Sequence, residues 1–256
     1  MPSATTKERV PTGIYGLDDL IQGGFIKSRT ILVSGSTGTG KSIFSLQWIY
    51  RGAAEYNEPG VYVTFDEAPD KIRQDMLNFG WNISELEKKG KIAIVDAAAA
   101  RAGLASEEEN ALMPGSLDFE KVLLEILNVA RRIGATRIAI DSVASMAQLL
   151  ETETQIRRNI LRLSHIITKS GLTAVITSEV PAQPIGGSAP MRFSKHEVEE
   201  YVADGVILLN FLGVGESATR TIYIRKMRGT KHSLEMHPFE ITDKGVVVKK
   251  IEEVFR

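Results

Sequence analysis

Cysteine is absent from the 256-residue sequence. Its absence excludes disulfide bonds, iron–sulfur clusters, thiol catalysis and cysteine-ligated zinc, and it fits a reducing interior. An excess of one charge is also absent. The sequence has 31 lysine and arginine residues and 32 aspartate and glutamate residues, which gives a net charge of −1. Bulk electrostatics therefore give no reason to expect binding to nucleic acid or to a membrane surface.

Long hydrophobic runs are missing as well. No stretch approaches the ~18 apolar residues that a membrane-spanning helix needs. Residues 1–10 are polar and lack the apolar segment of a signal peptide. We therefore expect a cytoplasmic protein without membrane association.

The sequence does contain an alternation of strand-like and helix-like segments. Apolar runs predict buried strands at residues 30–35, 60–65, 91–95, 136–141 and 172–178. Helices are predicted between them, at residues 42–56, 69–79, 117–133 and 153–169. Alternating β and α elements imply an α/β fold with a mostly parallel central sheet flanked by helices. The length is within the range of one α/β unit, so we expect a single domain over residues 1–256.

The C-terminal part has a different pattern. Short β-like runs there predict antiparallel hairpins at one edge of the sheet, over residues 205–212, 220–228, 237–242 and 245–251. Two long loops are also predicted, at residues 97–116 and 179–195, and the second is rich in proline and glycine.

The most specific motif is GSTGTGKS at residues 35–42, which matches the P-loop pattern G-x-x-x-x-G-K-[ST]. It follows a predicted buried strand and begins a predicted helix, so the alternative of a glycine-rich turn without a ligand is disfavoured. Its backbone N–H groups and the helix start suit phosphate oxygens. Lys41 is expected to reach the β- and γ-phosphates of ATP, and the Ser42 hydroxyl is expected to bind Mg²⁺. The expected nucleotide contacts are Thr37, Gly38, Thr39, Gly40, Lys41, Ser42 and Ile43.

Acidic residues end two of the predicted strands. Asp141 follows the run Arg-Ile-Ala-Ile, as in a Walker B element, and is expected to hold Mg²⁺ beside Ser42. Asp66 and Glu67 follow the strand at 60–65, where a carboxylate can orient or deprotonate the attacking water. We assign Glu67 as the base and Asp66 as its support. The alternative is that one or both acids cap the helix beginning near Pro69.

A basic strand is predicted near the C-terminus, over residues 224–232. Residues two apart share one face of a strand, so Lys226 and Arg228 project together with Met227 opposite. Two cations on one face suit a triphosphate. A solvated basic edge strand is the equal alternative on composition alone.

Together these segments resemble the KaiC family, the ATPase domains of the circadian clock protein and its archaeal and bacterial relatives within the RecA/RadA superfamily. The similarity covers nearly the whole chain. It rests on PTGIYGLDDLIQGG at 11–24, the P-loop, VTFDE at 63–67, IDSV at 140–143, KMRGTKH at 226–232 and ITDKG at 241–245. The pairing of Lys-x-Arg-Gly-Thr with Ile-Thr-Asp-x-Gly is specific to this family.

The resemblance implies a RecA-like core that assembles with itself into a hexameric ring, with ATP between subunits. One subunit would supply the P-loop, the acidic pair and Asp141, and its neighbour would supply Lys226 and Arg228 to the γ-phosphate. The further contacts implied on the sugar and base side are Thr230, His232, Thr242, Asp243 and, from the P-loop subunit, Asn78, with Met227 between the two cations.

Two departures from the family pattern bear on activity. Clock proteins carry two such domains, and the second phosphorylates a neighbouring Ser-Thr pair, where this chain has Glu200 and Tyr201. We therefore expect an ATPase without autokinase activity of the clock type. The acidic pair is Asp66-Glu67 in place of two glutamates, which leaves the role of Asp66 open.

Two other functions stay open at this point. In a recombinase-like ATPase the loop at 179–195 would bind DNA, but it offers only Arg192, Lys195 and Phe193, which is thin for a nucleic-acid surface. A nucleotide-dependent assembly module with little turnover is the other. The leading hypothesis is an ATPase ring that drives or times a regulatory assembly, with an unidentified protein as partner.

Overall fold

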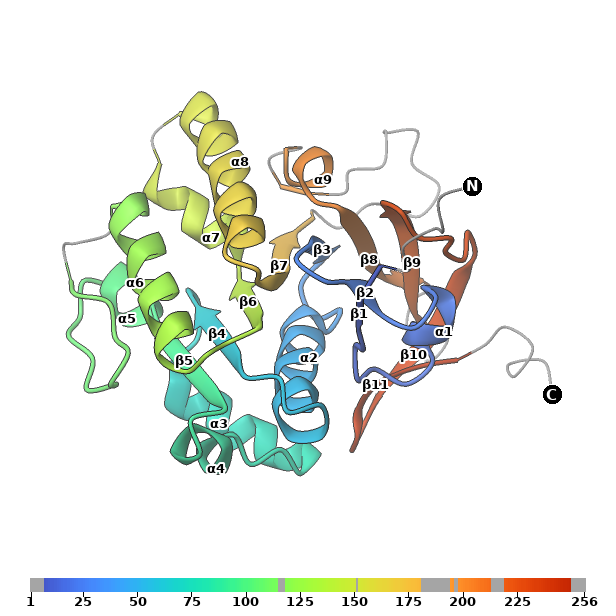
Figure 1. The fold of residues 1–256 in the computed structure, drawn as a ribbon, viewed down its shortest axis with the longest axis horizontal. Coiled ribbons are helices and arrows are strands. Elements are labelled where there is room, and N and C mark those ends of the chain that lie inside the picture. Colours follow the sequence, from blue (N-terminus) through green and yellow to red (C-terminus); the bar gives the residue numbers. More distant parts are fainter. Residues whose placement is uncertain are drawn as a thin grey trace.

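A computed structural model of the chain describes residues 7–114, 118–150, 152–180, 194–195, 198–212 and 219–249. Within these residues nine strands form one sheet in the order β11-β10-β9-β8-β3-β7-β6-β4-β5 (Figure 1). The strands of this sheet are β3 (Thr30–Gly35), β4 (Gly60–Thr64), β5 (Ile92–Asp96), β6 (Arg137–Asp141), β7 (Thr173–Glu179), β8 (Gly205–Leu212), β9 (Thr219–Met227), β10 (Met236–Thr242) and β11 (Gly245–Val248). A separate antiparallel pair joins β1 (Arg9–Val10) to β2 (Phe25–Ile26).

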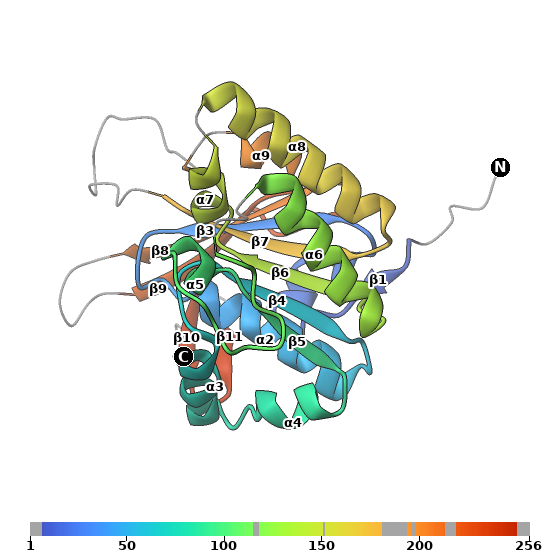
Figure 2. The same ribbon diagram turned by 90° about the vertical axis from the view of Figure 1, so that its left-hand side faces the viewer.

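Helices cover both faces of the sheet, as the alternating pattern predicts (Figure 2). One face carries α2 (Lys41–Glu55), α3 (Pro69–Met76) and α4 (Ile83–Lys88), and the other carries α6 (Phe119–Arg132) and α8 (Glu153–Lys169). The shorter helical segments are α1 (Leu17–Leu20), η1 (Leu77–Phe79), α5 (Ala98–Arg101), α7 (Val143–Met146), η2 (Ala147–Leu149) and α9 (Glu199–Val202).

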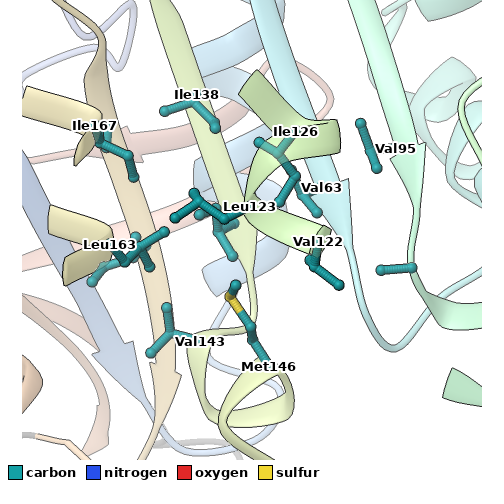
Figure 3. Packing of buried hydrophobic residues seen from close by; sticks show 14 of the residues in the cluster. Val63, Val95, Val122, Leu123, Ile126, Ile138, Val143, Met146, Leu163 and Ile167 are labelled. Carbon is teal, nitrogen blue, oxygen red and sulfur yellow. The ribbon is translucent and has the colours of Figure 1, made fainter. Parts of the chain in front are cut away.

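Two hydrophobic layers form because successive strand residues point to opposite faces. Strand β4 shows this directly: Val61 and Val63 pack against α6, whereas Tyr62 packs toward α2. Figure 3 shows the α6 and α8 side of this packing, where Leu123 and Leu163 meet the sheet. Both layers are closed to solvent, so the sheet is a rigid support for the loops at its ends.

The direction of each strand decides which edge of the sheet its ends reach. The strands β8, β3, β7, β6, β4 and β5 are parallel, so their carboxyl ends share one edge, here called the carboxyl edge. Strand β9 is antiparallel to β8, with Phe211 opposite Arg220 and Gly205 opposite Met227. Arg220 therefore lies at the carboxyl edge, and Met227 lies at the opposite, amino edge.

The structure corrects part of the predicted C-terminal pattern. The run at 205–212 forms the predicted antiparallel hairpin with the next strand, β9, but β8 lies inside the sheet and not at its edge, because it also pairs parallel with β3. Antiparallel pairing begins only between β8 and β9 and continues through β10 and β11. The loop predicted at 97–116 contains the short helix α5, and α7 and α9 are further short helices that the sequence pattern did not predict. Leu117, expected in the helix that is α6, lies outside the described residues.

Candidate functional site

The P-loop lies at the carboxyl edge, between the last residue of β3 and the first residue of α2. Gly38 and Gly40 have φ angles of 80° and 101°, which side chains other than glycine rarely adopt. The Lys41 ammonium donates to the carbonyls of Gly35 and Ser36, each at 3.0 Å. Burial lowers the pKa of Lys41, and the nearby carboxylates of Glu179 and Asp141 oppose that shift.

A cleft of about 380 Å³ opens beside this loop and gathers most of the predicted chemistry. Its walls bring together the P-loop, the acidic pair and the end of β6, as the common edge of parallel strands requires. Two residues that sequence reasoning did not single out, Glu179 and Arg220, also line it. The lining residues are Thr37, Gly38, Gly40, Lys41, Ser42, Ile43, Thr64, Asp66, Glu67, Asp141, Ser142, Glu179, Arg220 and Ile241. Thr39 is buried beneath the loop, where its hydroxyl donates to the Ser36 carbonyl at 2.8 Å.

Both oxygens of Asp141 are held by hydroxyl groups from neighbouring strands. The Tyr62 hydroxyl donates to one oxygen at 2.7 Å, and the Thr177 hydroxyl donates to the other at 2.5 Å. Tyr62 is buried, and burial followed by the charge of Asp141 raises the pKa of its hydroxyl well above the ordinary value. The tyrosine therefore stays protonated and donates, which fixes the carboxylate at the mouth of the cleft.

Asp66 and Glu67 both reach the cleft, but their carboxylates have different partners. Asp66 accepts from the Ser145 hydroxyl at 2.6 and 2.9 Å and forms an ion pair with Arg101 at 2.9 Å. Among the residues that the structure describes, the Glu67 carboxylate pairs with the exposed Lys71 alone, at 2.6 Å and four residues further on. No side-chain capping bond from either acid to the start of α3 is present, so the capping alternative does not apply to that helix.

Arg220 is a cleft residue that the sequence pattern does not identify. It is the second residue of the antiparallel strand β9, at the carboxyl edge, and its guanidinium lies 4.8 Å from the ring centroid of Phe211. Its Nε atom is buried and has no hydrogen-bond partner among the described residues. Only the direction of β9 brings it to the cleft, and the sequence pattern did not give that direction. Glu179 ends β7, so the rule already applied to Asp141 could have identified it.

Lys226 and Arg228 lie away from this cleft, at the amino edge. Lys226 is the second-last residue of β9, Arg228 lies in the turn after the strand, and both donate to carbonyls near α9. The Lys226 ammonium contacts the carbonyls of Glu200 at 3.0 Å and Ala203 at 2.7 Å, and the Arg228 guanidinium contacts that of Tyr201 at 3.1 Å. Met227 between them is buried.

The remaining residues implied by the resemblance divide between the two edges. Thr242 ends β10 at the carboxyl edge, next to Ile241 of the cleft, and Asp243 follows it in the exposed turn before β11. Thr230 accepts from the Arg9 guanidinium at 3.1 Å, and His232 follows it. Both lie just after the last residue of β9, at the amino edge. Asn78 is exposed in η1. Residues 181–193, the centre of the loop considered for DNA, lie outside the described residues.

The donor set of the cleft fits a magnesium nucleotide. Mg²⁺ takes one or two protein oxygens and completes its shell with water and phosphate oxygens. The cleft offers the Ser42 hydroxyl and the fixed Asp141 carboxylate. No cluster of three or more potential metal-binding side chains occurs within the part of the chain that the structure describes. Over the same residues, no helix is both long and apolar enough to cross a bilayer.

Comparisons with known proteins agree with this geometry. The family model of the KaiC ATPase matches residues 10–253. A UPF0273 protein of Aeropyrum pernix is 39% identical over 242 residues, covering 94% of this chain and 93% of its own. The circadian clock oscillator protein KaiC of Thermosynechococcus vestitus is 36% identical over 241 residues, and the match spans 44% of its length.

A solved structure is similar over nearly the whole chain. It is a KaiC-like protein of Pyrococcus horikoshii, with 40% identity and a TM-score of 0.81, covering 96% of this chain and 100% of that one. The RecA-like fold of the family and the P-loop cleft agree with the sheet order described above. By sequence, fold and nucleotide cleft, the chain belongs to the KaiC ATPase family and is an ATP-binding P-loop ATPase domain of that family.

Proposed function

We propose that the protein hydrolyses ATP at sites shared between neighbouring copies of the chain, arranged head to tail in a ring. One copy contributes the P-loop cleft at the carboxyl edge, and the next contributes Lys226 and Arg228 from its amino edge. The resemblance to the KaiC family favours six copies. The observation that carries this proposal is the separation of the two half-sites on opposite edges of one sheet.

The separation is too large for one chain to complete the site alone. Arg220 lines the cleft, and Lys226 lies six residues further along the same strand. A strand rises about 3.4 Å per residue, so the two positions are roughly 20 Å apart. A phosphate bound by Lys41 is therefore beyond the reach of Lys226 and Arg228 in the same chain. Contact between unlike edges is a heterologous contact, which closes into a ring when the rotation allows.

The motif residues of the cleft have separate roles in this proposal. The P-loop amides and Lys41 bind the phosphates, and Ser42 and Asp141 hold Mg²⁺. Mg²⁺ held by these two residues would neutralise charge on the phosphates. Glu67 orients and deprotonates the attacking water, and Asp66, fixed by Ser145 and Arg101, supports it.

The neighbouring copy completes the site. Its Arg228 and Lys226 stabilise the charge on the transferring phosphoryl group, and its Thr230 and His232 approach the sugar. The base side of the P-loop copy is formed by Asn78, Thr242 and Asp243. A shared site thus unites residues that one chain keeps on two edges of its sheet.

The proposed biological role is a ring that drives or times a regulatory assembly through a protein partner. Self-phosphorylation of the clock type is not part of this role, because Glu200 and Tyr201 occupy the region of the family's Ser-Thr acceptor pair.

Mixing two inactive variants tests the shared site. Lys41→Ala removes the P-loop cation, and Arg228→Ala removes the cation delivered by the neighbour, which in phosphoryl transfer is worth ~10³–10⁵ in rate. Each variant alone should release almost no phosphate. After subunit exchange, the mixture should regain part of the wild-type rate, because some interfaces then pair an intact P-loop with an intact Arg228.

The control is Arg162→Ala, which alters an exposed arginine of α8 whose partner is Glu120. Mixed with Lys41→Ala, it should behave as wild type does in the same mixture. Absence of recovery in the Lys41→Ala and Arg228→Ala mixture, with exchange demonstrated by labelled subunits, would refute the shared site and leave a single-chain nucleotide-binding domain.

A further inference from the structure

Asp204 is a buried carboxylate between the P-loop strand and the two cations of the amino edge. Its side chain is 10% exposed and lies directly after α9 and before β8. One oxygen accepts from the Arg29 guanidinium at 2.6 Å and lies 3.7 Å from the Arg228 guanidinium. The other oxygen accepts from the backbone N–H of Thr30 at 3.3 Å, the first residue of β3.

The backbone of Asp204 reinforces both connections. Its N–H donates to the Thr30 carbonyl at 2.8 Å, and its carbonyl accepts from the Arg228 N–H at 2.8 Å. Asp204 is therefore bonded to the strand that ends in the P-loop and to the residue that carries the second cation. Four hydrogen bonds hold Asp204 rigidly. A cation that must reach a substrate at a fixed position needs such rigid support.

The two cations beside Asp204 are not equally available. Lys226 directs its ammonium at the carbonyls of Glu200, Tyr201 and Ala203, which accounts for the three donors that an ammonium has. Arg228 is 53% exposed and has five donors, of which one bonds the Tyr201 carbonyl. Arg228 thus has donors on its solvent side that no described residue accepts, while its inner side faces Asp204 and that carbonyl.

We propose that Asp204 is a positioning residue for Arg228: its carboxylate, fixed to the start of β3, aims the guanidinium at the nucleotide of the neighbouring copy. This inference rests on the shared site proposed above. The carboxylate touches no substrate, and it acts only through the cation. A guanidinium that is displaced by about 1 Å can lose ~10²-fold in rate, because catalysis by positioned charge depends steeply on geometry.

Asp204→Asn tests the proposal, because the amide keeps the size of the side chain and its bond to Thr30 but loses the charge. We expect kcat for ATP hydrolysis to fall about 10- to 100-fold, with KM changed by less than about threefold. Mixed with Lys41→Ala, Asp204→Asn should regain activity, because its P-loop is intact. Mixed with Arg228→Ala, it should regain none, because both variants are defective on the same side of the interface.

The matched control is Arg29→Gln, which removes the other partner of Asp204 and leaves the carboxylate free to face Arg228. It should keep kcat within about twofold of wild type. An equal loss in Arg29→Gln and Asp204→Asn would show that Asp204 acts through Arg29 alone and would overturn the proposal. Recovery in the mixture with Arg228→Ala, or none with Lys41→Ala, would also overturn it.

The mixtures also distinguish failure of the shared site from failure of the role proposed for Asp204. If Lys41→Ala and Arg228→Ala do not complement each other, the shared site fails, and the role of Asp204 fails with it. If that pair does complement and only the Asp204 mixtures deviate, the shared site stands and Asp204 alone is refuted. Should Asp204→Asn not fold, Asp204→Glu retains the charge at a displaced position, and the same mixtures must assign its defect to the Arg228 side.

Discussion

Asp66 and Glu67 show how contacts assign different tasks to adjacent acids. The oxygens of Asp66 are engaged by Ser145 and Arg101, so this carboxylate is fixed in place. Over the described part of the chain, Glu67 has Lys71 as its one partner, and such surface pairs contribute about 0.2–1 kcal/mol. Glu67 can therefore leave its partner and turn to a water in the cleft, whereas Asp66 cannot do so without breaking two contacts.

We expect Glu67→Gln to bind ATP with unchanged affinity and to release phosphate ~10²–10⁴-fold more slowly, because an amide cannot accept the proton of the attacking water. Calorimetry measures the binding, and a phosphate-release assay measures the rate. Lys71→Met is the control, since it removes the partner of Glu67 and should leave the rate near wild type. Normal turnover in Glu67→Gln together with loss in Asp66→Asn would reverse the assignment.

At the scale of the residue, the sequence predicted those cleft residues whose positions depend on local backbone structure. A P-loop fixes the relative positions of Lys41 and Ser42 by local backbone structure, and a strand ending in Asp141 points to the carboxyl edge. Arg220 could not be found in this way, because its place depends on the direction of β9. The partners of Asp66 come from α5 and α7, two helices of four residues each that are too short to show a periodic pattern.

Among the elements, Arg137 joins β6 to α2 and to the N-terminal segment. Its side chain is fully buried, pairs with Glu58 at 2.5 Å and donates to the carbonyls of Trp48 at 2.8 Å and Pro11 at 2.9 Å. Burial lowers the pKa of Arg137, and the charge of Glu58 opposes the shift. Three segments therefore depend on one guanidinium.

Arg137→Met should lower the free energy of unfolding by about 3 kcal/mol, because it leaves two backbone carbonyls and Glu58 without their donor. For a chain of this size that is a fall in Tm of roughly 6–12 °C. Arg162→Met is the matched control, as its pair with Glu120 is exposed, and it should change stability by less than about 1 kcal/mol. Thermal unfolding monitored by circular dichroism measures both, and equal shifts would contradict the role of Arg137.

The elements themselves were largely predictable from hydrophobic patterning. The helix predicted at 153–169 agrees with α8 in both bounds, because a capping box at Thr152 and Gln155 begins it and Gly171 follows its end. The direction of β8 was not predictable, since an apolar run has the same pattern in parallel and antiparallel pairing. That direction follows from pairing with β3, a contact across more than 170 residues of sequence.

At the scale of the whole molecule, carboxylates outnumber cations at one edge of the sheet. The cleft at the carboxyl edge presents Asp66, Glu67, Asp141 and Glu179 with the two cations Lys41 and Arg220. The amino edge presents Lys226 and Arg228. Burial and the neighbouring Arg228 lower the pKa of Lys226, and Asp204 and Glu200 oppose this shift. In the proposed head-to-tail contact, the carboxylates of one copy would attract these two cations of the next.

Nucleotide should therefore favour assembly, since ATP bound between two copies adds contacts to the interface. We expect Mg·ATP to raise the sedimentation coefficient toward that of a ring, and we expect Lys41→Ala to show no such rise. Because the attraction between edges is electrostatic, salt at about 1 M should weaken the assembly. A mass of one subunit at saturating Mg·ATP, with bound nucleotide measured in the same sample, would contradict this prediction.

Strand β9 has one consequence for a ring of this kind. Its first residues place Arg220 in the cleft of its own chain. In the proposed ring, its other end would offer cations to the next nucleotide, so one strand would face two different ATP molecules. Because the two ends differ in kind, a change at one nucleotide would pass to one neighbour and not to the other. A closed circle of such strands has a sense of rotation, and successive turnovers would travel around it in one direction.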